Sequence, residues 1–304
     1  MNGSGTICLK DFYRRRMLRI FPAYYAFLGV YLLLYFAGHI PIDWAAFGSA
    51  AKFLMNYRRS FAGHFFDQFW ITWSLGIEEQ FYLLWPLSFL LFGKRPKALS
   101  VGLICLITAV NLYRVAAVYL FHFQGIYVFD AFETRCDALA VGCLLAIGIT
   151  QGYGESVLRA IRKHPALVLL PVAALLALIL SRYGVRDFDW RRLFTMMIEP
   201  WLSAVLIAQL IYFGQGELRW LESQLFLFLG PLFYSLYLYH LPVLQAINAF
   251  LHGQHPRLAA IIAAPLSLIA ALCSYRFIEQ PFLRLRRRGG LLRGPTHSNA
   301  TPLP

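Results

Sequence analysis

Apolar residues occur in long runs that short polar segments separate. A helix that crosses a bilayer needs about 20 predominantly apolar residues, and most of the runs approach or exceed that length. The runs that predict spanning helices are residues 20–37, 72–92, 98–121, 136–150, 166–182, 198–214, 225–250 and 258–278. The fourth run is short. Its helix could begin near Gly125 if Asp130, Glu133 and Arg135 line an aqueous vestibule. We therefore predict an all-α, polytopic membrane helical bundle with about eight transmembrane helices.

The composition supports lipid as the solvent of this chain. Hydrophobic residues make up 59% of the sequence and charged residues 14%. A soluble domain of this size could not bury so much apolar surface in one core. The formal net charge of +13 has two interpretations, a nucleic-acid-binding surface or the cytoplasmic Lys and Arg excess of membrane proteins. The apolar runs favour the second, so we expect no nucleic-acid partner.

The distribution of basic residues predicts the orientation. With a cytoplasmic N-terminus, the inside segments carry about twice as many Lys and Arg residues as the outside segments. We therefore expect both termini to be cytoplasmic. Three segments are predicted: a basic N-terminal segment at 1–19, a transmembrane domain at 20–280, and a tail at 281–304 that is basic and then disordered. Residues 1–19 lack the apolar core of a cleavable signal peptide.

A cluster of arginines stands directly before the first predicted span. Arg14, Arg15 and Arg16 are consecutive, and Arg19 follows one helical turn after Arg16. Such a run can simply anchor the topology. It can also bind phosphate, because the planar guanidinium holds phosphate oxygens bidentately and a three-residue spacing puts Arg16 and Arg19 on one helix face.

A second polar cluster lies at the start of the second predicted span. Ser74, Glu78 and Tyr82 are four residues apart and form one stripe on a helix. Acidic residues within a span normally face the bundle or a wet cavity and mark a functional site. The alternative is an interfacial pair of glutamates bonded to an arginine, which suits Glu79 better than Glu78.

A third cluster contains Tyr234, Tyr237 and His240, which recur every three residues and so share a face. A neutral imidazole can accept a proton near neutral pH and act as a general base. The alternative is a histidine that only hydrogen-bonds between helices. The tyrosine hydroxyls make a polar pocket the more plausible surrounding.

Two weaker signals concern charges near predicted helix ends. Arg135 and Asp137 precede a short apolar run and could form a local ion pair. Arg114 lies well inside a span and needs a partner, for which Glu78, Glu79 and Glu199 are the candidates. The five cysteines show no metal-ligand spacing, so we expect no metal site.

Five strings together resemble the acyltransferase 3 family. They are FYRRRMLRIFPAYY (12–25), WSLGIEEQFYLLWP (73–86), TRCDALAVGCLLA (134–146), YSLYLYHLPV (234–243) and YRFIEQPFLRLRRR (275–288). The resemblance implies a ten-helix enzyme of the bacterial inner membrane. It would move an acyl group, often acetyl, from acyl-CoA to a hydroxyl of a saccharide or lipid-linked acceptor, as in modified lipopolysaccharide or peptidoglycan. No bound cofactor is implied, since acyl-CoA is a co-substrate.

The resemblance also implies a role for the arginine cluster. The family's RxxR motif maps onto Arg16 and Arg19, with Arg15 beside them, on the acyl-CoA side. From the residues themselves, our catalytic candidates are Glu78 and His240, the latter as a substitute base. The residues expected to line a substrate channel are Ser74, Tyr82, Tyr237, Arg135 and Asp137.

The sequence departs from the family at its start. The family's first span carries an Arg and a His thought to be catalytic, and its second span carries a Ser-Gly-Phe-Leu-like stretch. Neither motif is found here. The expectation is that the chain begins two helices late and that it can be inactive as written. Two other functions stay open: a transporter or channel for acyl groups or saccharide, and a non-catalytic subunit of a polysaccharide assembly complex.

Overall fold

The computed structural model describes residues 9–62, 68–93, 95–156, 159, 165–181, 190–213 and 222–288. Every regular element within these ranges is helical, which confirms the all-α prediction. The chain divides into two compact units. The first unit consists of Met1–Ile42 and Phe228–Pro304, and the second of Asp43–Leu227.

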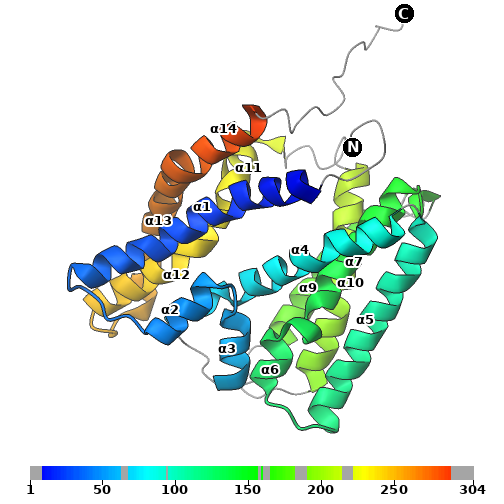
Figure 1. The fold of residues 1–304 in the computed structure, drawn as a ribbon, viewed down its shortest axis with the longest axis horizontal. Helices are drawn as coiled ribbons and strands as arrows, with labels where there is room; N and C mark the ends of the chain where they lie inside the picture. Colours follow the sequence, from blue (N-terminus) through cyan, green and yellow to red (C-terminus); the bar gives the residue numbers. More distant parts are fainter. Residues whose placement is uncertain are drawn as a thin grey trace, which may run out of the picture. The chain divides into compact units, whose positions relative to one another are not determined.

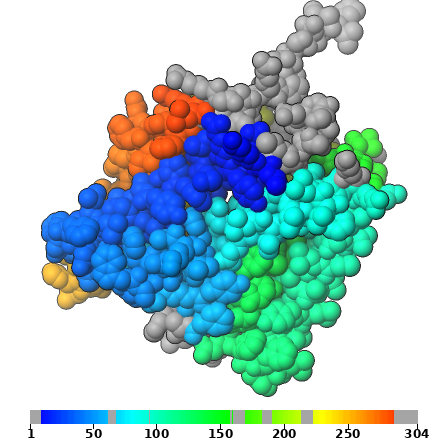
Figure 2. All heavy atoms as spheres, viewed as in Figure 1, coloured from blue at the N-terminus to red at the C-terminus, as the bar shows by residue number. Residues whose placement is uncertain are grey.

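The first unit pairs the beginning of the chain with its end. Its elements are α1 (Leu9–Phe36), α12 (Phe233–Phe250), α13 (Pro256–Ser274), a π-helical turn (Tyr275–Glu279) and α14 (Gln280–Arg288). Helix α13 packs along α12, and α1 contacts α12, the π turn and α14 (Figure 1). The N-terminal helix and the C-terminal α14 lie side by side, blue and orange in Figure 2.

Small side chains explain the close pairing of α12 and α13. Ala259, Ala263, Ser267 and Ala271 follow one another at four-residue intervals along α13, and all four are buried. Small residues at this spacing let two helix backbones approach closely in a membrane, where packing replaces the hydrophobic effect between helices.

The second unit contains the central helices. They are α2 (Trp44–Ala51), α3 (Met55–Ala62), α4 (Trp73–Phe92), α5 (Pro96–Tyr119), α6 (Gly125–Asp130), α7 (Cys136–Thr150), α9 (Pro165–Ser181) and α10 (Trp190–Phe213). Short 3₁₀ turns at Trp70–Thr72 and Phe132–Thr134 precede α4 and α7, and α11 (Gln224–Leu229) leads through Gly230–Leu232 toward α12. Leu99, Leu103 and Ile107 of α5 pack against Ala140 and Val141 of α7 and Ala204 of α10. Helix α4 lies against α5, cyan and green in Figure 2.

A glycine permits the close contact of α3 and α4. A Cβ atom on Gly76 would lie 2.7 Å from the carbonyl oxygen of Phe53 and 2.9 Å from Oδ1 of Asn56. The side chain of Gln80, one turn further along α4, donates to the same Phe53 oxygen at 3.1 Å and to Asn56 Oδ1 at 3.1 Å. The start of α4 is therefore fixed against the short α3 helix.

Each of the eight predicted spans falls on a helix. Within the described residues, five helical segments are long and apolar enough to cross a membrane: Leu9–Phe36, Pro96–Tyr119, Trp190–Tyr212, Gln224–Phe250 and Pro256–Leu285. The protein is therefore a multi-pass membrane protein. Whether α4, α7 and α9 also span the membrane stays a prediction, as does the total of eight. Residues 1–8 and the tail beyond residue 288 lie outside the described residues.

Candidate functional site

Three of the predicted phosphate ligands gather at the start of α1. Arg15, Arg16 and Arg19 line a pocket of about 210 Å³ together with Phe12. The guanidinium of Arg16 lies over the Phe12 ring, 5.8 Å from its centroid, which orients it. Arg14 is exposed and is not part of the pocket lining. The pocket concentrates three planar cations at one place, an arrangement that suits an anion with several oxygens.

A buried acid lies in the same unit, at the end of the π turn. The carboxylate of Glu279 accepts a hydrogen bond from the Ser235 hydroxyl, which is also 2.8 Å from the Ser274 hydroxyl. All three side chains are buried, and the charge of Arg19 acts on Glu279. The sequence does not reveal this cluster, because the π turn that precedes the contact is visible only in the structure. Isolated π turns are frequent at functional sites.

Tyr237 and His240 line one pocket between α12 and α13. The pocket has a volume of about 490 Å³, and Phe233, Ala263 and Ser267 also contribute to its walls. The rings of Tyr237 and His240 are 6.0 Å apart between centroids. Tyr234, the third member of the predicted face, instead donates to the carbonyl oxygen of Ile20 at 3.0 Å and so joins α12 to α1.

The backbone fixes the tautomer of His240. Its Nδ1 atom is 2.7 Å from the carbonyl oxygen of Tyr237 and 3.1 Å from that of Leu236. A carbonyl oxygen can only accept, so Nδ1 carries the proton in the neutral ring. The Nε2 atom is then the unprotonated nitrogen, which can accept a proton from a ligand.

The polar stripe predicted on α4 is part of the second unit. Ser74, Glu78 and Tyr82 are all partly buried, and Tyr82 packs against Phe81 and its neighbours. Arg135 and Asp137 belong to this unit as well. The predicted site residues therefore divide between the units: the arginines of α1 with Tyr237 and His240 in one, and the α4 stripe with Arg135 and Asp137 in the other.

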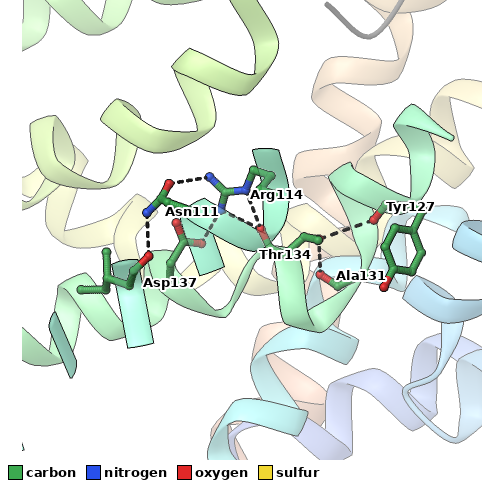
Figure 3. A network of polar contacts seen from close by, with 7 residues as sticks. Asn111, Arg114, Tyr127, Ala131, Thr134 and Asp137 are labelled. Carbon is green, nitrogen blue, oxygen red and sulfur yellow. Dashed lines mark hydrogen bonds and ion pairs between the residues drawn. The ribbon is translucent and has the colours of Figure 1, made fainter. Parts of the chain in front are cut away.

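The chain between α6 and α7 is a break in a helix, where the sequence suggested a vestibule. Helix α6 ends at Asp130, Ala131 is extended with ψ of 146°, and α7 begins at Cys136. The fully buried Arg114 satisfies this break by donating from Nε and Nη2 to the Thr134 carbonyl oxygen at 3.0 and 2.7 Å (Figure 3). Irregular backbone in a membrane protein needs such internal partners.

The ion pair of Arg114 corrects one expectation. Its Nη2 atom is 2.7 Å from Oδ1 of Asp137, so the partner predicted among Glu78, Glu79 and Glu199 was wrong (Figure 3). The Asp137 charge also acts on Arg135, but the residue within ion-pair distance of Asp137 is Arg114. Asp137 lies in the first turn of α7, directly after the carbonyl that Arg114 holds, so one guanidinium reaches both groups.

Two tyrosines bind Glu133 at the break, and a third contacts one of them. Its carboxylate accepts hydrogen bonds from Tyr57, at 2.8 Å, and from Tyr127, whose hydroxyl is 2.9 Å from that of Tyr113. Burial and the hydrogen bond to Glu133 raise the pKa of both Tyr57 and Tyr127, so these phenols stay neutral. The sequence did not reveal this cluster, because Tyr57 and Glu133 are 76 residues apart.

A second acid at the break is more deeply buried. Asp130 has no exposed surface, and one of its oxygens is 3.3 Å from Nε of Arg59. Within the described residues, neither carboxylate oxygen has a hydrogen-bond partner. Burial raises the pKa of Asp130 to about 7, although Arg59 and Arg135 act to lower it.

Arg135 is held by aromatic rings. Its guanidinium is 5.9 Å from the centroid of Trp73 and 5.2 Å from that of Phe129. The same side chain lines a cavity of about 240 Å³ between α7 and α10, together with Glu199 and Ser203. Burial has the largest effect on the pKa of Arg135 and lowers it. The other charges that act on it are those of Arg114, Asp137, Glu199 and Asp130.

Comparison with known proteins identifies the family. Residues 4–276 match a family model described as an acyltransferase domain. The chain belongs to the acyltransferase 3 family. This acyltransferase 3 chain is 29% identical over 304 residues to the O-acetyltransferase OatA of Staphylococcus aureus, covering 93% of this chain and 48% of that protein. It is 28% identical over 308 residues to the peptidoglycan O-acetyltransferase OatA of Listeria monocytogenes, covering 92% and 47%.

The chain spans about half the length of these curated relatives. No solved structure matches it.

Proposed function

We propose that this chain is a membrane-bound acyltransferase that moves an acyl group, most readily acetyl, from acyl-CoA to a hydroxyl of a saccharide or related acceptor. The observation that carries the proposal is the pocket in which Arg15, Arg16 and Arg19 converge. Family membership supports acyl transfer. The relatives are named O-acetyltransferases, and the name of the Listeria protein gives peptidoglycan as its acceptor.

The arginine pocket suits the nucleotide end of the donor. Coenzyme A carries a pyrophosphate and a ribose phosphate, and each offers oxygens that a guanidinium can hold in pairs. Arg16 is already oriented by Phe12, so less rotamer freedom is lost on binding. We place this end of α1 at the cytoplasmic face of the bacterial inner membrane, because basic residues are in excess on the cytoplasmic side of membrane proteins.

The pocket beside His240 suits the acceptor. A volume of about 490 Å³ lies in the range of small-molecule pockets, which combine apolar and aromatic walls with a few polar groups. Nε2 of His240 would take the proton of the acceptor hydroxyl. The hydroxyl oxygen would attack the thioester carbonyl, the carbon–sulfur bond would break, and the departing thiolate would receive the proton. The products are an ester and free CoA.

The experiment measures CoA binding by the full chain in lipid nanodiscs. Losing one charge-assisted phosphate contact costs about 1.5–3 kcal/mol, so Arg16→Ala and Arg19→Ala should each weaken CoA affinity about ten- to hundredfold. Arg14→Ala is the matched control, because Arg14 lies on the same helix but outside the pocket lining. If Arg14→Ala weakens binding as much as Arg16→Ala does, only general positive charge acts and the site is wrong.

A second measurement separates the enzyme from a transporter. An acyltransferase releases free thiol from acetyl-CoA in proportion to the ester formed. A transporter or channel moves its substrate without consuming the thioester, and a scaffolding subunit does neither. Thiol release that is absent while acceptor crosses the membrane would overturn the proposed reaction.

A further inference from the structure

The start of α1 and the end of α14 are both basic, and they belong to the same unit. Lys10 and Arg14 are exposed on α1 and are four residues apart, which places them on one helix face. Helix α14 ends in the string RLRRR, in which Arg284 is exposed. The two helices contact each other, and Figure 2 shows the dark blue start of α1 beside the orange α14. We call Lys10, Arg14 and Arg284 the basic surface.

The acidic residues of this unit do not balance its positive charge. In the sequence of Met1–Ile42 and Phe228–Pro304 they are Asp11 and Glu279. Glu279 is buried, and its carboxylate already accepts a hydrogen bond from Ser235. Like charges on neighbouring helices repel each other and weaken the contact between them. An anion that binds to both helices would therefore stabilise the packing of α14 against α1.

Both basic ends belong to helices that are longer than the hydrocarbon core of a membrane is thick. The candidate spans Leu9–Phe36 and Pro256–Leu285 contain 28 and 30 residues, which correspond to about 42 and 45 Å at the rise of an α-helix. The hydrocarbon core of a bilayer is about 30 Å thick. Because charged side chains are costly inside the core, the basic ends of α1 and α14 extend into the layer of lipid headgroups.

Exposed apolar side chains flank the basic surface. Met17 follows Arg14 by three residues on α1, and Phe282 and Leu285 lie on either side of Arg284 along α14. Helices that combine basic and large apolar side chains are typical of the membrane interface, where cations meet lipid phosphates and apolar groups enter the acyl region. A soluble phosphate compound would leave these apolar side chains in water.

We propose that the basic surface binds an anionic phospholipid of the phosphatidylglycerol class. Its phosphate lies between α1 and α14, and its acyl chains cover Met17 and Leu285. The surface is distinct from the pocket of Arg15, Arg16 and Arg19, because none of its three residues belongs to the lining of that pocket. The inference is therefore independent of the proposed reaction. The bound lipid holds the first and the last described helix of the chain together at the membrane surface.

The test follows lipid binding by hydrogen exchange in the full chain. The protein in dodecyl maltoside is titrated with dioleoyl phosphatidylglycerol, and exchange is measured for peptides from the start of α1 and from α14. A ligand that binds the packed helices should slow their exchange in proportion to its occupancy. We expect slower exchange of both peptides with phosphatidylglycerol, no change with dioleoyl phosphatidylcholine, and a weaker effect of phosphatidylglycerol at high salt.

Removing single charges gives the expected size of the effect. A Lys or Arg near an anionic membrane surface contributes about a fivefold factor in affinity, so Arg14→Gln and Arg284→Gln should each raise the half-saturating lipid concentration about fivefold. The triple variant that adds Lys10→Gln should raise it about a hundredfold. Arg284→Lys keeps the charge and should bind the lipid like the wild type. Arg257→Gln is the matched control, because Arg257 is exposed in the same unit at the start of α13, the opposite end of the segment that leads to α14.

Three results would each overturn the inference. The first is equal protection by phosphatidylcholine. The second is an equal loss of affinity in Arg257→Gln, which would mean that overall charge acts. The third is equal protection by soluble glycerol phosphate at the same phosphate concentration, which would assign the surface to a soluble anion. CoA affinity should stay constant in Arg284→Gln, so a failure of CoA binding at Arg16 and a failure of lipid binding can be told apart.

Discussion

Nη2 of Arg114 and Oδ1 of Asp137 are 2.7 Å apart, and both side chains are buried. The same guanidinium donates two hydrogen bonds to the Thr134 carbonyl oxygen at the break between α6 and α7 (Figure 3). One residue of α5 thus fixes the backbone on which Glu133 and Arg135 stand. The position of these two side chains depends on a pair that touches neither of them.

Removing Arg114 should therefore destabilise the protein strongly. Arg114→Met leaves the Asp137 carboxylate buried without its partner, which costs about 3–5 kcal/mol. Lys97→Met, at an exposed position of the same helix, should change stability little. Denaturant unfolding in detergent, followed by near-UV circular dichroism, measures the difference. The double variant Arg114→Met with Asp137→Leu should recover part of the loss, and an unchanged Arg114→Met protein would contradict the assignment.

The buried Asp130 should make stability depend on pH. Its pKa is raised from an ordinary value of 3.8 to about 7, so between these values the folded chain binds a proton that the unfolded chain has released. The stabilisation from this group is complete below about pH 4 and is lost as the pH rises through 7, at up to about 1.4 kcal/mol per pH unit. Asp130→Asn should flatten the stability profile over this range. Parallel profiles for the two proteins would refute the prediction.

Gly76 should tolerate no side chain. The added Cβ would lie 2.7 Å from the Phe53 carbonyl oxygen, which is backbone and cannot move away cheaply. Gly76→Ala should thus cost about 1–3 kcal/mol by separating α4 from α3. Gly102→Ala is the comparison, because a Cβ there has no atom within 4 Å. Equal unfolding midpoints for the two variants would show that the α3–α4 contact is not limiting.

The helices were predictable from the sequence because lipid imposes a length on them. Runs of about 20 apolar residues have few alternatives in a membrane, and within the described residues each of the eight runs overlaps a helix. The arginine cluster and the face shared by Tyr237 and His240 follow from helical periodicity, which is a local property. In the structure the three arginines line one pocket and Tyr237 and His240 line another, as their spacing along single helices predicts.

Contacts between helices were not predictable, because periodicity gives a face but not what lies opposite it. Arg114 was expected to meet a glutamate, and the structure pairs it with Asp137. Ser235 and Glu279 are 44 residues apart, and no spacing rule connects them. The break between α6 and α7 was recognised as a possible vestibule, yet the buried Arg114 that stabilises it belongs to the preceding helix.

The tautomer of His240 gives a last prediction that can be tested with and without turnover. Nδ1 is held by the Tyr237 carbonyl oxygen, so ¹⁵N NMR of histidine-labelled protein should show an unprotonated Nε2 in the neutral ring. If Nε2 is the general base, His240→Gln should lower acetyl transfer about a hundredfold or more while CoA affinity stays constant. His255→Gln, outside the pocket lining, is the control. A protonated Nε2, or full transfer by His240→Gln, would remove His240 from the mechanism.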